Sequence, residues 1–258
     1  MKLFSKLGLL KPNIKGVYPD RNIGLIDDNS PFAMREAYKT LYTNIVYMGL
    51  NDKCRKIAVT SAVPSEGKST VSANLAYTIS HNSKDTKILL IDADMRAPRI
   101  ARIFGINPKH HGLSEFLAGV DKEPNFIDIK DKNLTVMTSG SRPINPTQLL
   151  SSSRMKQLMD ICEERFDYVI IDTLPVNIVA DALLFSNYVN GYVLSVLADR
   201  SDIKGVKQCV EQLQQINAVI FGFVISGVKM KHNSGKYGYG YGRYSSRYSD
   251  KGYGDDNS

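Results

Sequence analysis

The stretch from Ala62 to Thr70 constrains the fold more than any other part of this chain. It reads Ala-Val-Pro-Ser-Glu-Gly-Lys-Ser-Thr, follows an apolar, strand-like run at 56–61 and precedes a helical pattern at 71–79. A strand, a turn with Gly-Lys-Ser and a helix, in this order, predict a P-loop, in which backbone N–H groups and a helix N-terminus hold phosphates. The expected nucleotide-binding residues are Ser65, Glu66, Gly67, Lys68, Ser69 and Thr70.

Two side chains of this loop have specific expected contacts. Lys68 would reach the β- and γ-phosphates, and the Ser69 hydroxyl would bind Mg²⁺. Ala62 stands where the plain motif has its first Gly. Because Ala is the smallest substitute and can still form the turn where φ is negative, the prediction of a phosphate-binding loop is kept.

Apolar runs alternate with helical patterns along the chain. The expected strands are 56–61, 87–92, 134–138, 167–172, 191–198 and 219–226, and the expected helices are 31–48, 67–80, 146–165, 178–188 and 202–217. Several of the apolar runs are continuous, which is typical of strands buried on both faces of a parallel sheet. The sequence therefore predicts an α/β fold of the P-loop NTPase type, with a mostly parallel central sheet and helices on both faces.

The composition changes at both ends of the chain. Residues 1–29 lack a sustained period and are predicted to form an N-terminal arm before a P-loop domain at 30–228. Residues 229–258 contain six Gly and six Tyr but no branched aliphatic residue. Such a segment cannot bury enough apolar area to offset its ordering entropy, so we expect a flexible, Tyr-rich C-terminal tail.

Overall charge and cysteine content restrict the class of protein. The net charge of +7 fits either solubility or an anionic partner, such as a nucleotide or the inner membrane surface. Cys54, Cys162 and Cys209 are far apart, which favours a reducing compartment over a zinc site or a disulfide framework. No segment is long enough to span a bilayer.

Two expected strands end in aspartate. Asp92 begins the run Asp-Ala-Asp-Met-Arg, and Asp172 follows Tyr-Val-Ile-Ile. Strand ends of a parallel sheet meet at the edge where a P-loop lies, and carboxylates there can hold Mg²⁺ directly or through water. The expected metal ligands are therefore Ser69, Asp92 and Asp172. Asp172 alone would also fit a helix cap or a turn.

The Asp-x-Asp-x-Arg run suggests a division of roles. One of its two carboxylates, Asp92 or Asp94, can hold the metal while the other takes a proton from a nucleophile. Arg96 could neutralise phosphate charge or contact a neighbouring subunit. A solvated helix residue is the alternative for Arg96.

These motifs, in this order, resemble those of the bacterial tyrosine kinases (BY-kinases) of capsular and exopolysaccharide systems, over roughly residues 30–258. The chain looks like the stand-alone cytoplasmic form. That family's Walker A form, Ala-x-x-x-x-Gly-Lys-Ser, is present from Ala62 to Ser69, and its Asp-x-Asp-x-Arg motif is present from Asp92 to Arg96. Its Walker B aspartate matches Asp172, and its C-terminal tyrosine cluster matches the tail.

The resemblance implies an ATP- and Mg²⁺-dependent protein-tyrosine kinase that phosphorylates its own tail and regulates capsular or exopolysaccharide synthesis and export. The catalytic residues it implies are Lys68, Asp92, Asp94 and Arg96, with Asp94 as our candidate base. The implied phosphorylation sites are Tyr237, Tyr239, Tyr241, Tyr244, Tyr248 and Tyr253.

The same resemblance implies partners and a location. The kinase would be cytoplasmic and recruited to the inner face of the plasma membrane by a membrane-embedded, polysaccharide co-polymerase-type activator. A protein-tyrosine phosphatase would act on it, and no nucleic acid partner is expected. A homo-oligomer is implied as well. Its ring size stays open because Lys39 and Tyr42 replace the arginines of the family's Glu-x-x-Arg-x-x-Arg motif, which starts here at Glu36.

Two other functions remain compatible with a P-loop. One is a positioning ATPase of the ParA/MinD-like type, whose signature lysine would occupy the position of Val63. The other is a nucleotide-gated scaffold of the export machinery. A Gly-, Tyr- and Arg-containing tail also occurs in RNA-binding segments. The absent signature lysine and the tyrosine cluster favour the kinase.

Overall fold

The computed structural model describes residues 24–27, 29–48, 53–83, 85–107, 109–130 and 132–228. The predicted flexible tail and its tyrosines lie outside the described residues, as does most of the predicted N-terminal arm. None of the described helices is long and apolar enough to cross a membrane.

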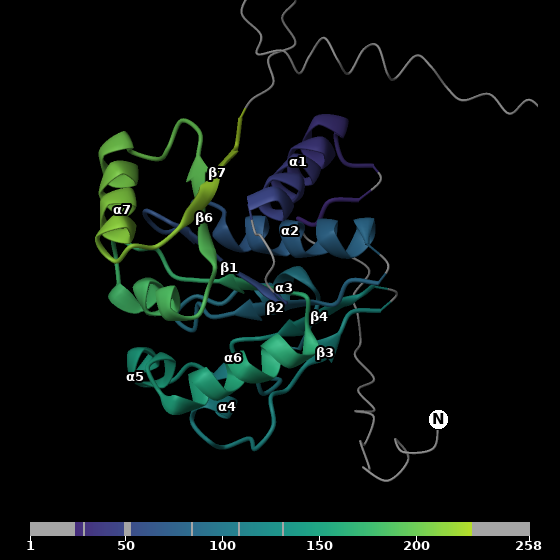
Figure 1. Cartoon of the computed structure of the whole chain (residues 1–258), viewed down its shortest axis with the longest axis vertical. Helices are drawn as coiled ribbons and strands as arrows, with labels where there is room; N and C mark the ends of the chain where they lie inside the picture. Colours follow the sequence, from purple (N-terminus) through teal and green to yellow (C-terminus); the bar gives the residue numbers. More distant parts are fainter. Residues whose placement is uncertain are drawn as a thin grey trace, which may run out of the picture.

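A seven-stranded sheet forms the centre of the molecule (Figure 1). Its strand order is β3-β4-β2-β5-β1-β6-β7, and every neighbouring pair is parallel except β3 with β4. The strands are β1 (Arg55–Ser61), β2 (Ile88–Asp92), β3 (Ile127–Asp128), β4 (Leu134–Met137), β5 (Tyr168–Asp172), β6 (Gly191–Leu197) and β7 (Ile220–Ser226). The mostly parallel α/β fold is therefore confirmed.

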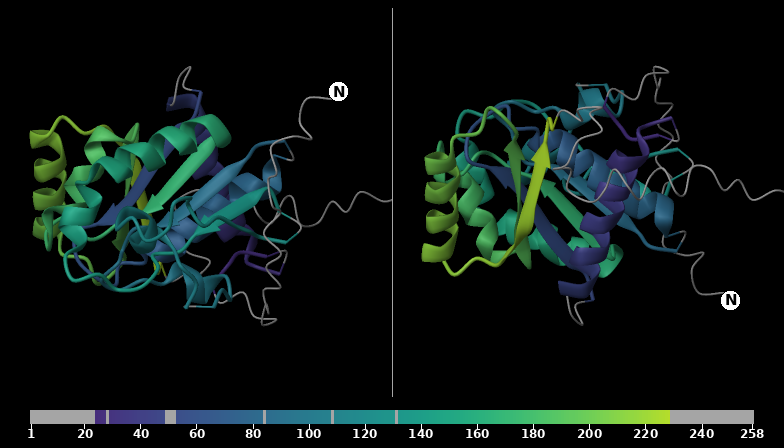
Figure 2. Two further views of the ribbon diagram at one scale, coloured as in Figure 1. Left: turned by 90° about the horizontal axis from the view of Figure 1, so that it is seen from below. Right: turned by 90° about the horizontal axis from the view of Figure 1, so that it is seen from above.

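Helices cover both faces of the sheet, as Figure 2 shows from two sides. They are α1 (Phe32–Met48), α2 (Lys68–Asn82), α3 (Ile100–Ile103), α4 (Leu113–Leu117), α5 (Pro146–Leu150), α6 (Ser153–Arg165), the 3₁₀ helix η1 (Ala180–Asn187) and α7 (Ile203–Gln215). Alternate residues of β2 belong to different apolar clusters. Leu89 packs in the cluster that includes α6 and α7, whereas Leu90 packs with α1 and α2. Because successive strand residues point to opposite faces, a continuously apolar strand is buried from both sides.

Some expected elements were wrong in detail. The helix expected at 146–165 is two helices, because the chain turns at Ser151 and Ser152, and the Ser152 hydroxyl donates to the carbonyl of Leu149. Such local side-chain bonds compete with helix continuation. The helix expected at 178–188 is a 3₁₀ helix over 180–187. The short elements α3, α4 and β3 were not predicted, since four, five and two residues carry no readable period.

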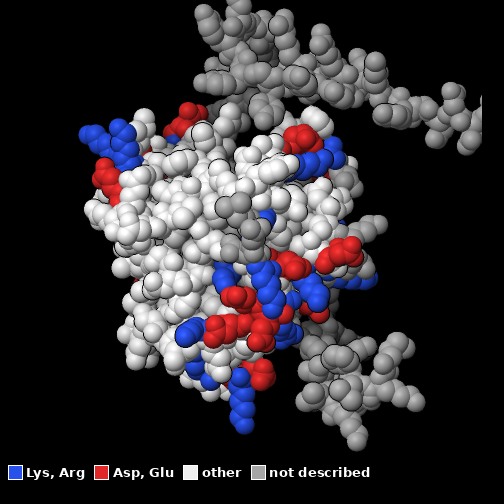
Figure 3. All heavy atoms as spheres, viewed as in Figure 1, with Lys and Arg blue, Asp and Glu red and all other residues white. Residues whose placement is uncertain are grey.

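The charge is mixed on the face shown in Figure 3. Acidic and basic side chains lie next to one another in its lower half, and much of the centre is uncharged. The net charge of +7 therefore does not gather into one patch of single sign on this face.

Candidate active site

The P-loop joins the end of β1 to the start of α2. Gly67 has a φ of 85°, in the left-handed region that glycine adopts readily, and a Cβ there would lie 3.3 Å from Ser226 Oγ. Ser65 also has a positive φ, of 67°. These two residues turn the chain so that α2 starts directly at Lys68. The backbone N–H groups of the first turn of a helix lack partners within the helix, so those of α2 could donate to phosphate oxygens.

Glu66 holds the loop in this shape. Its carboxylate accepts a hydrogen bond from the Val63 N–H at 3.0 Å and another from the Ser201 hydroxyl, and its carbonyl accepts one from the Ser195 hydroxyl. Only 3% of Glu66 is exposed. Glu66 therefore links the P-loop to β6 through Ser195 and to the loop after β6 through Ser201, and these bonds stabilise the conformation of the P-loop.

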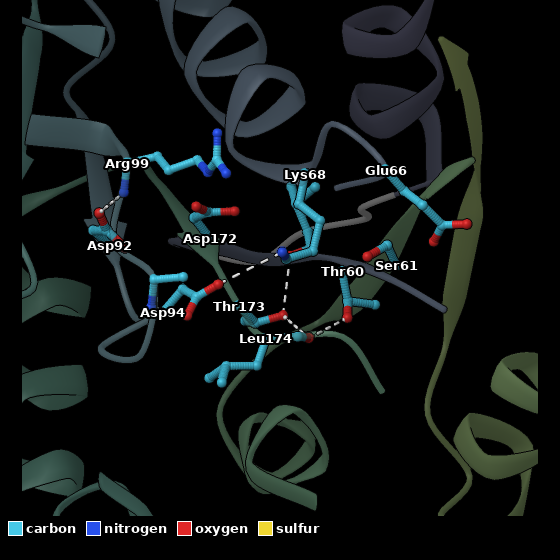
Figure 4. A network of polar contacts seen from close by, with 12 residues as sticks. Thr60, Ser61, Glu66, Lys68, Asp92, Asp94, Arg99, Asp172, Thr173 and Leu174 are labelled. Atoms are coloured by element: carbon cyan, nitrogen blue, oxygen red, sulfur yellow. Dashed lines mark hydrogen bonds and ion pairs between the residues drawn. The ribbon is translucent and has the colours of Figure 1, made fainter. Parts of the chain in front are cut away.

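Lys68 forms a buried ion pair with Asp94. The Lys68 Nζ lies 3.6 Å from Asp94 Oδ2, and less than one tenth of either side chain is exposed. Figure 4 shows the two side chains pointing toward each other across the sheet edge. The other Asp94 oxygen accepts the Ala97 N–H at 2.9 Å, which orients the carboxylate. The P-loop lysine and the second aspartate of the Asp-x-Asp-x-Arg run therefore share one site.

Asp92 and Asp172 end neighbouring parallel strands at the same level. They are partners in the register of β2 and β5, and both have no exposed surface. Asp92 Oδ2 accepts the N–H groups of Arg99 and Ile100, at 3.1 and 3.0 Å, and so holds the start of α3 (Figure 4). Asp172 Oδ1 accepts the Ser72 hydroxyl at 3.1 Å.

Burial raises the pKa of both carboxyls. The pKa of Asp92 lies well above its ordinary value because the group is buried and because Asp172 carries like charge beside it. Burial also raises the pKa of Asp172, to about 6, although Lys68 and the Ser69 hydroxyl oppose that rise. Negative charge on these two carboxyls is therefore disfavoured, and a cation bound beside them would stabilise it.

The oxygen donors at this sheet edge fit a magnesium ion whose remaining ligands come from a nucleotide. Asp92 Oδ1 and Asp172 Oδ2 are buried and have no hydrogen-bond partner among the residues that the structure describes. Unpartnered buried carboxylate oxygens are costly, and a bound cation would relieve that cost. In the described part of the chain, no three His, Cys, Asp or Glu side chains form a metal site by themselves. Hydroxyl and phosphate oxygens would have to supply the remaining ligands.

Arg96 is held by Asp181, a partner that no motif in the sequence indicates. Its Nη2 donates to Asp181 Oδ2 at 3.0 Å, and the Thr147 hydroxyl donates to the other Asp181 oxygen at 2.6 Å. Asp181 is buried, whereas 41% of the Arg96 side chain is exposed. This pair joins the turn after β2 to α5 and to η1. Part of the Arg96 side chain therefore stays accessible to solvent.

The structure brings most of the predicted residues together. Lys68 and Asp94 form an ion pair, and Asp172 is bonded to Ser72 on the same helix as Lys68 and Ser69. The side chains of Ser65 and Thr70 are exposed beside the loop. Sequence reasoning missed Ser72 and Asp181. Ser72 lies one helical turn after Lys68, so that spacing could have indicated it, but nothing nearby in the sequence indicated Asp181.

Comparison with known proteins agrees with this geometry. The sequence profile of an AAA domain family matches residues 54–221. The chain is 36% identical over 204 residues to tyrosine-protein kinase YwqD of Bacillus subtilis, which covers 79% of this chain and 85% of that relative.

Solved structures with 33% identity share the fold. The kinase domain of Escherichia coli tyrosine kinase ETK superposes with a TM-score of 0.74 over 85% of this chain and 86% of that chain. The chimerical protein CapA2B2 superposes with a TM-score of 0.70 over 76% of this chain and 85% of that one. With relatives above 30% identity aligned over more than three quarters of its length, the chain belongs to the bacterial tyrosine-protein kinase family.

Proposed function

We propose that this chain is a protein-tyrosine kinase that transfers the γ-phosphoryl group of ATP to tyrosine hydroxyls and regulates capsular or exopolysaccharide synthesis and export. The meeting of Lys68 and Asp94 at 3.6 Å, beside the buried Asp92 and Asp172, supports this proposal most directly. In this proposal, Lys68 is the phosphate-binding amine, Asp94 is the candidate base, and the carboxylates of Asp92 and Asp172 would bind the metal ion at the same sheet edge. Phosphoryl transfer needs mainly such positioning and charge stabilisation.

Each group has a distinct role in this proposal. Lys68 and the N–H groups of the loop hold the phosphates of ATP, and Lys68 leaves Asp94 for the phosphate oxygens when ATP enters. Ser69, Asp92 and Asp172 would hold Mg²⁺, some of them through water, and the ion would neutralise charge on the transferring phosphoryl group. Arg96 lies at the rim, where its guanidinium can meet the phosphate or the incoming tyrosine segment.

Asp94 is the proposed acceptor of the tyrosine proton. A phenol with a pKa of about 10 is mostly protonated at neutral pH, so a nearby base assists its attack on the phosphoryl group. Asp94 has the better position, because it loses its partner when Lys68 turns to the phosphates. Asp92 has no exposed surface and is engaged with the first N–H groups of α3.

The proposed acceptors are the tail residues Tyr237, Tyr239, Tyr241, Tyr244, Tyr248 and Tyr253. Each phosphate adds a charge of about −1.5 to −2. The segment carries six basic and three acidic residues, so a few phosphates would invert its sign. We further propose that this charge loosens a homo-oligomer of the kinase, and that a protein-tyrosine phosphatase reverses the change.

A membrane-embedded activator of the polysaccharide co-polymerase type is the proposed partner, and it would recruit the kinase to the inner face of the plasma membrane. The similarity to the chimerical protein CapA2B2 supports association with a CapA-type partner. The motif that starts at Glu36 is altered in this chain. Lys39 pairs with Glu36 within the same helix at 2.8 Å, and the Tyr42 ring packs on Tyr168, so these groups already have intramolecular contacts.

Incubation of the purified full-length chain with Mg·ATP tests the kinase proposal. We expect phosphotyrosine on the tail, detected by antibody and mass spectrometry, and a stronger signal when the cytoplasmic segment of a membrane activator is added. Lys68→Met should lower the rate by about 100-fold or more. Lys156→Met, at an exposed position of α6, is the matched control. Full phosphorylation by a folded Lys68→Met variant would refute the proposal.

A further inference from the structure

A separate cavity of about 280 Å³ lies at the far end of α2 from the P-loop. Residues of α1, of the C-terminal part of α2 and of the turns before α1 and β4 line it. Because α2 rises about 1.5 Å per residue, His81 lies roughly 20 Å along the helix from Lys68. The cavity is therefore distinct from the candidate active site.

The cavity carries an excess of positive groups. Four lining side chains can be cationic, namely Arg35, Lys39, His81 and Lys132, against the single carboxylate of Asp27. Asp27 Oδ1 accepts the Ser30 hydroxyl at 2.8 Å, so that carboxylate has a neutral partner. Within the described residues, the ion pairs found include Lys39 with Glu36 but none that involves Arg35, His81 or Lys132.

Arg35 has an unused donor in this cavity. Its Nε is buried and has no hydrogen-bond partner among the described residues. A buried, unsatisfied donor costs about 1–3 kcal/mol, and more when it is charged, so a turn of the Arg35 side chain that lets Nε meet a ligand oxygen in the cavity would be favoured. Arg35 also lies in the first turn of α1, where the helix dipole favours an anion.

Lys132 and two rings form the opposite wall. The Lys132 Nζ lies 4.6 Å from the centroid of the Tyr77 ring and 3.5 Å from His81 Nδ1. Tyr77 and His81 are stacked, with centroids 6.2 Å apart and planes 6° apart. The negative end of the α2 dipole attracts positive groups, which explains why His81 and Lys132 lie there. It does not account for Arg35, which comes from the positive end of a different helix.

We propose that this cavity binds a phosphotyrosine side chain of the tail at 229–258, from the same chain or from a second copy. Arg35 and Lys132 would hold the phosphate by charge-assisted hydrogen bonds, and the Tyr77–His81 wall would face the phenyl ring. The inference rests on the proposed function, because the kinase itself produces this ligand. The chain continues for 30 residues beyond Val228, and an unstructured segment of that length spans roughly 30 Å.

Binding of synthetic peptides tests this site without any kinase reaction. Peptides that cover residues 237–248, with and without phosphate on tyrosine, are titrated by calorimetry into full-length, dephosphorylated protein in the absence of ATP. We expect the phosphopeptide to bind at least tenfold more tightly than the unphosphorylated peptide. Arg35→Gln and Lys132→Gln should each weaken it about tenfold or more, whereas Lys156→Gln should leave it unchanged.

Further measurements distinguish the phosphorylated tail from other ligands that carry phosphate or negative charge. Inorganic phosphate that binds as tightly as the phosphopeptide would overturn the assignment to the tail. Binding of anionic vesicles that requires Arg35 and Lys132, together with phosphopeptide binding that does not require them, would overturn it too. Binding that is lost in Lys68→Met but kept in Arg35→Gln would mean product binding at the active site and would also overturn it. Because no step uses ATP, an inactive enzyme would leave this result unaffected. Thermal unfolding verifies that each variant is folded.

Discussion

At the residue scale, the main feature is the buried ion pair between Lys68 and Asp94. The lysine that should hold phosphates is 3.6 Å from Asp94, in a place where little of either side chain is exposed. A buried charge without a partner is costly, so this ion pair stabilises both buried side chains. In the proposed mechanism, nucleotide binding would replace one negative partner of Lys68 by another and would release the Asp94 carboxylate for proton transfer.

Asp94→Asn tests this exchange. The amide oxygen can still accept the Ala97 N–H, so the local turn should be retained. We expect the turnover number to fall by about 10²- to 10⁴-fold, the range for loss of a general base, while Mg·ATP binding changes little. Single-turnover phosphorylation and ATP titration measure the two quantities. Asp160→Asn, at an exposed position of α6, is the control. Normal turnover of Asp94→Asn would exclude this aspartate as the base.

The sequence could indicate only part of this site. The apolar runs predict that Asp92 and Asp172 end strands and that the Gly-Lys-Ser turn follows one. Because the strands were expected to be parallel, the meeting of these residues at one sheet edge was predictable. The bond between Arg96 and Asp181 joins residues 85 positions apart, and that contact depends on how η1 packs. No local period or motif encodes such a contact.

At the scale of elements, Glu115 joins α4 to the loop after β4. Its carboxylate accepts hydrogen bonds from the Gly112 N–H at 2.8 Å and from the N–H and hydroxyl of Ser141. Burial would raise the pKa of Glu115, but these bonds outweigh it and hold the pKa at about 2, below its ordinary value of 4.5. Because the pKa is lowered in the folded state, this carboxylate stabilises the fold above pH 4.5, and the stabilisation is lost as the pH falls toward 2.

Glu115→Gln should therefore destabilise the protein in a pH-dependent way. An amide supplies one acceptor and brings two donors toward the Gly112 N–H and the hydroxyls, so we expect a loss of roughly 1–3 kcal/mol in the free energy of unfolding at pH 7. The difference from the parent protein should shrink as the pH is lowered from 4.5. Urea unfolding at several pH values measures it, with the exposed Glu164→Gln of α6 as control. A difference that stays constant over this range would contradict the role of the charge.

The elements themselves were predictable in proportion to their length. Six strands and the helices α1, α2 and α7 were expected close to their observed bounds, because each carries several turns or a continuous apolar run. The break at Ser151 and Ser152 was missed since serine is compatible with helix and turn alike. The antiparallel β3 is held by its pairing with β4, which is not visible locally.

At the scale of the whole molecule, the chain from Gly24 to Val228 contains both apolar clusters that pack against the sheet. The first of these residues are already bound to the domain. Asn74, buried on α2, accepts the Ile26 N–H at 2.7 Å and donates to the Gly24 carbonyl at 2.9 Å, and Ile26 is buried. The contacts on this side therefore begin before residue 30, which was the expected start of the domain.

Truncation after Val228 tests the proposed boundary at the other end. We expect the shortened chain to unfold within about 2 °C of the full-length protein, because no residue of the two clusters is removed. It should bind ATP normally and lose most of its phosphotyrosine. Differential scanning calorimetry and phosphotyrosine detection measure the two effects. A large fall in the unfolding temperature would show that the tail contributes to the packed domain.

The hydrogen bonds between Asp92 and the start of α3 would couple metal binding to the position of that helix. One oxygen of this carboxylate grips the leading amides of α3, and the other faces the place where a cation would sit. Because the carboxylate of Asp92 is rigid, a shift of the second oxygen toward a cation would also move the oxygen that binds the start of α3. The loop that carries Asp94 and Arg96 joins Asp92 to α3, so an ion bound at Asp92 would also restrain that loop.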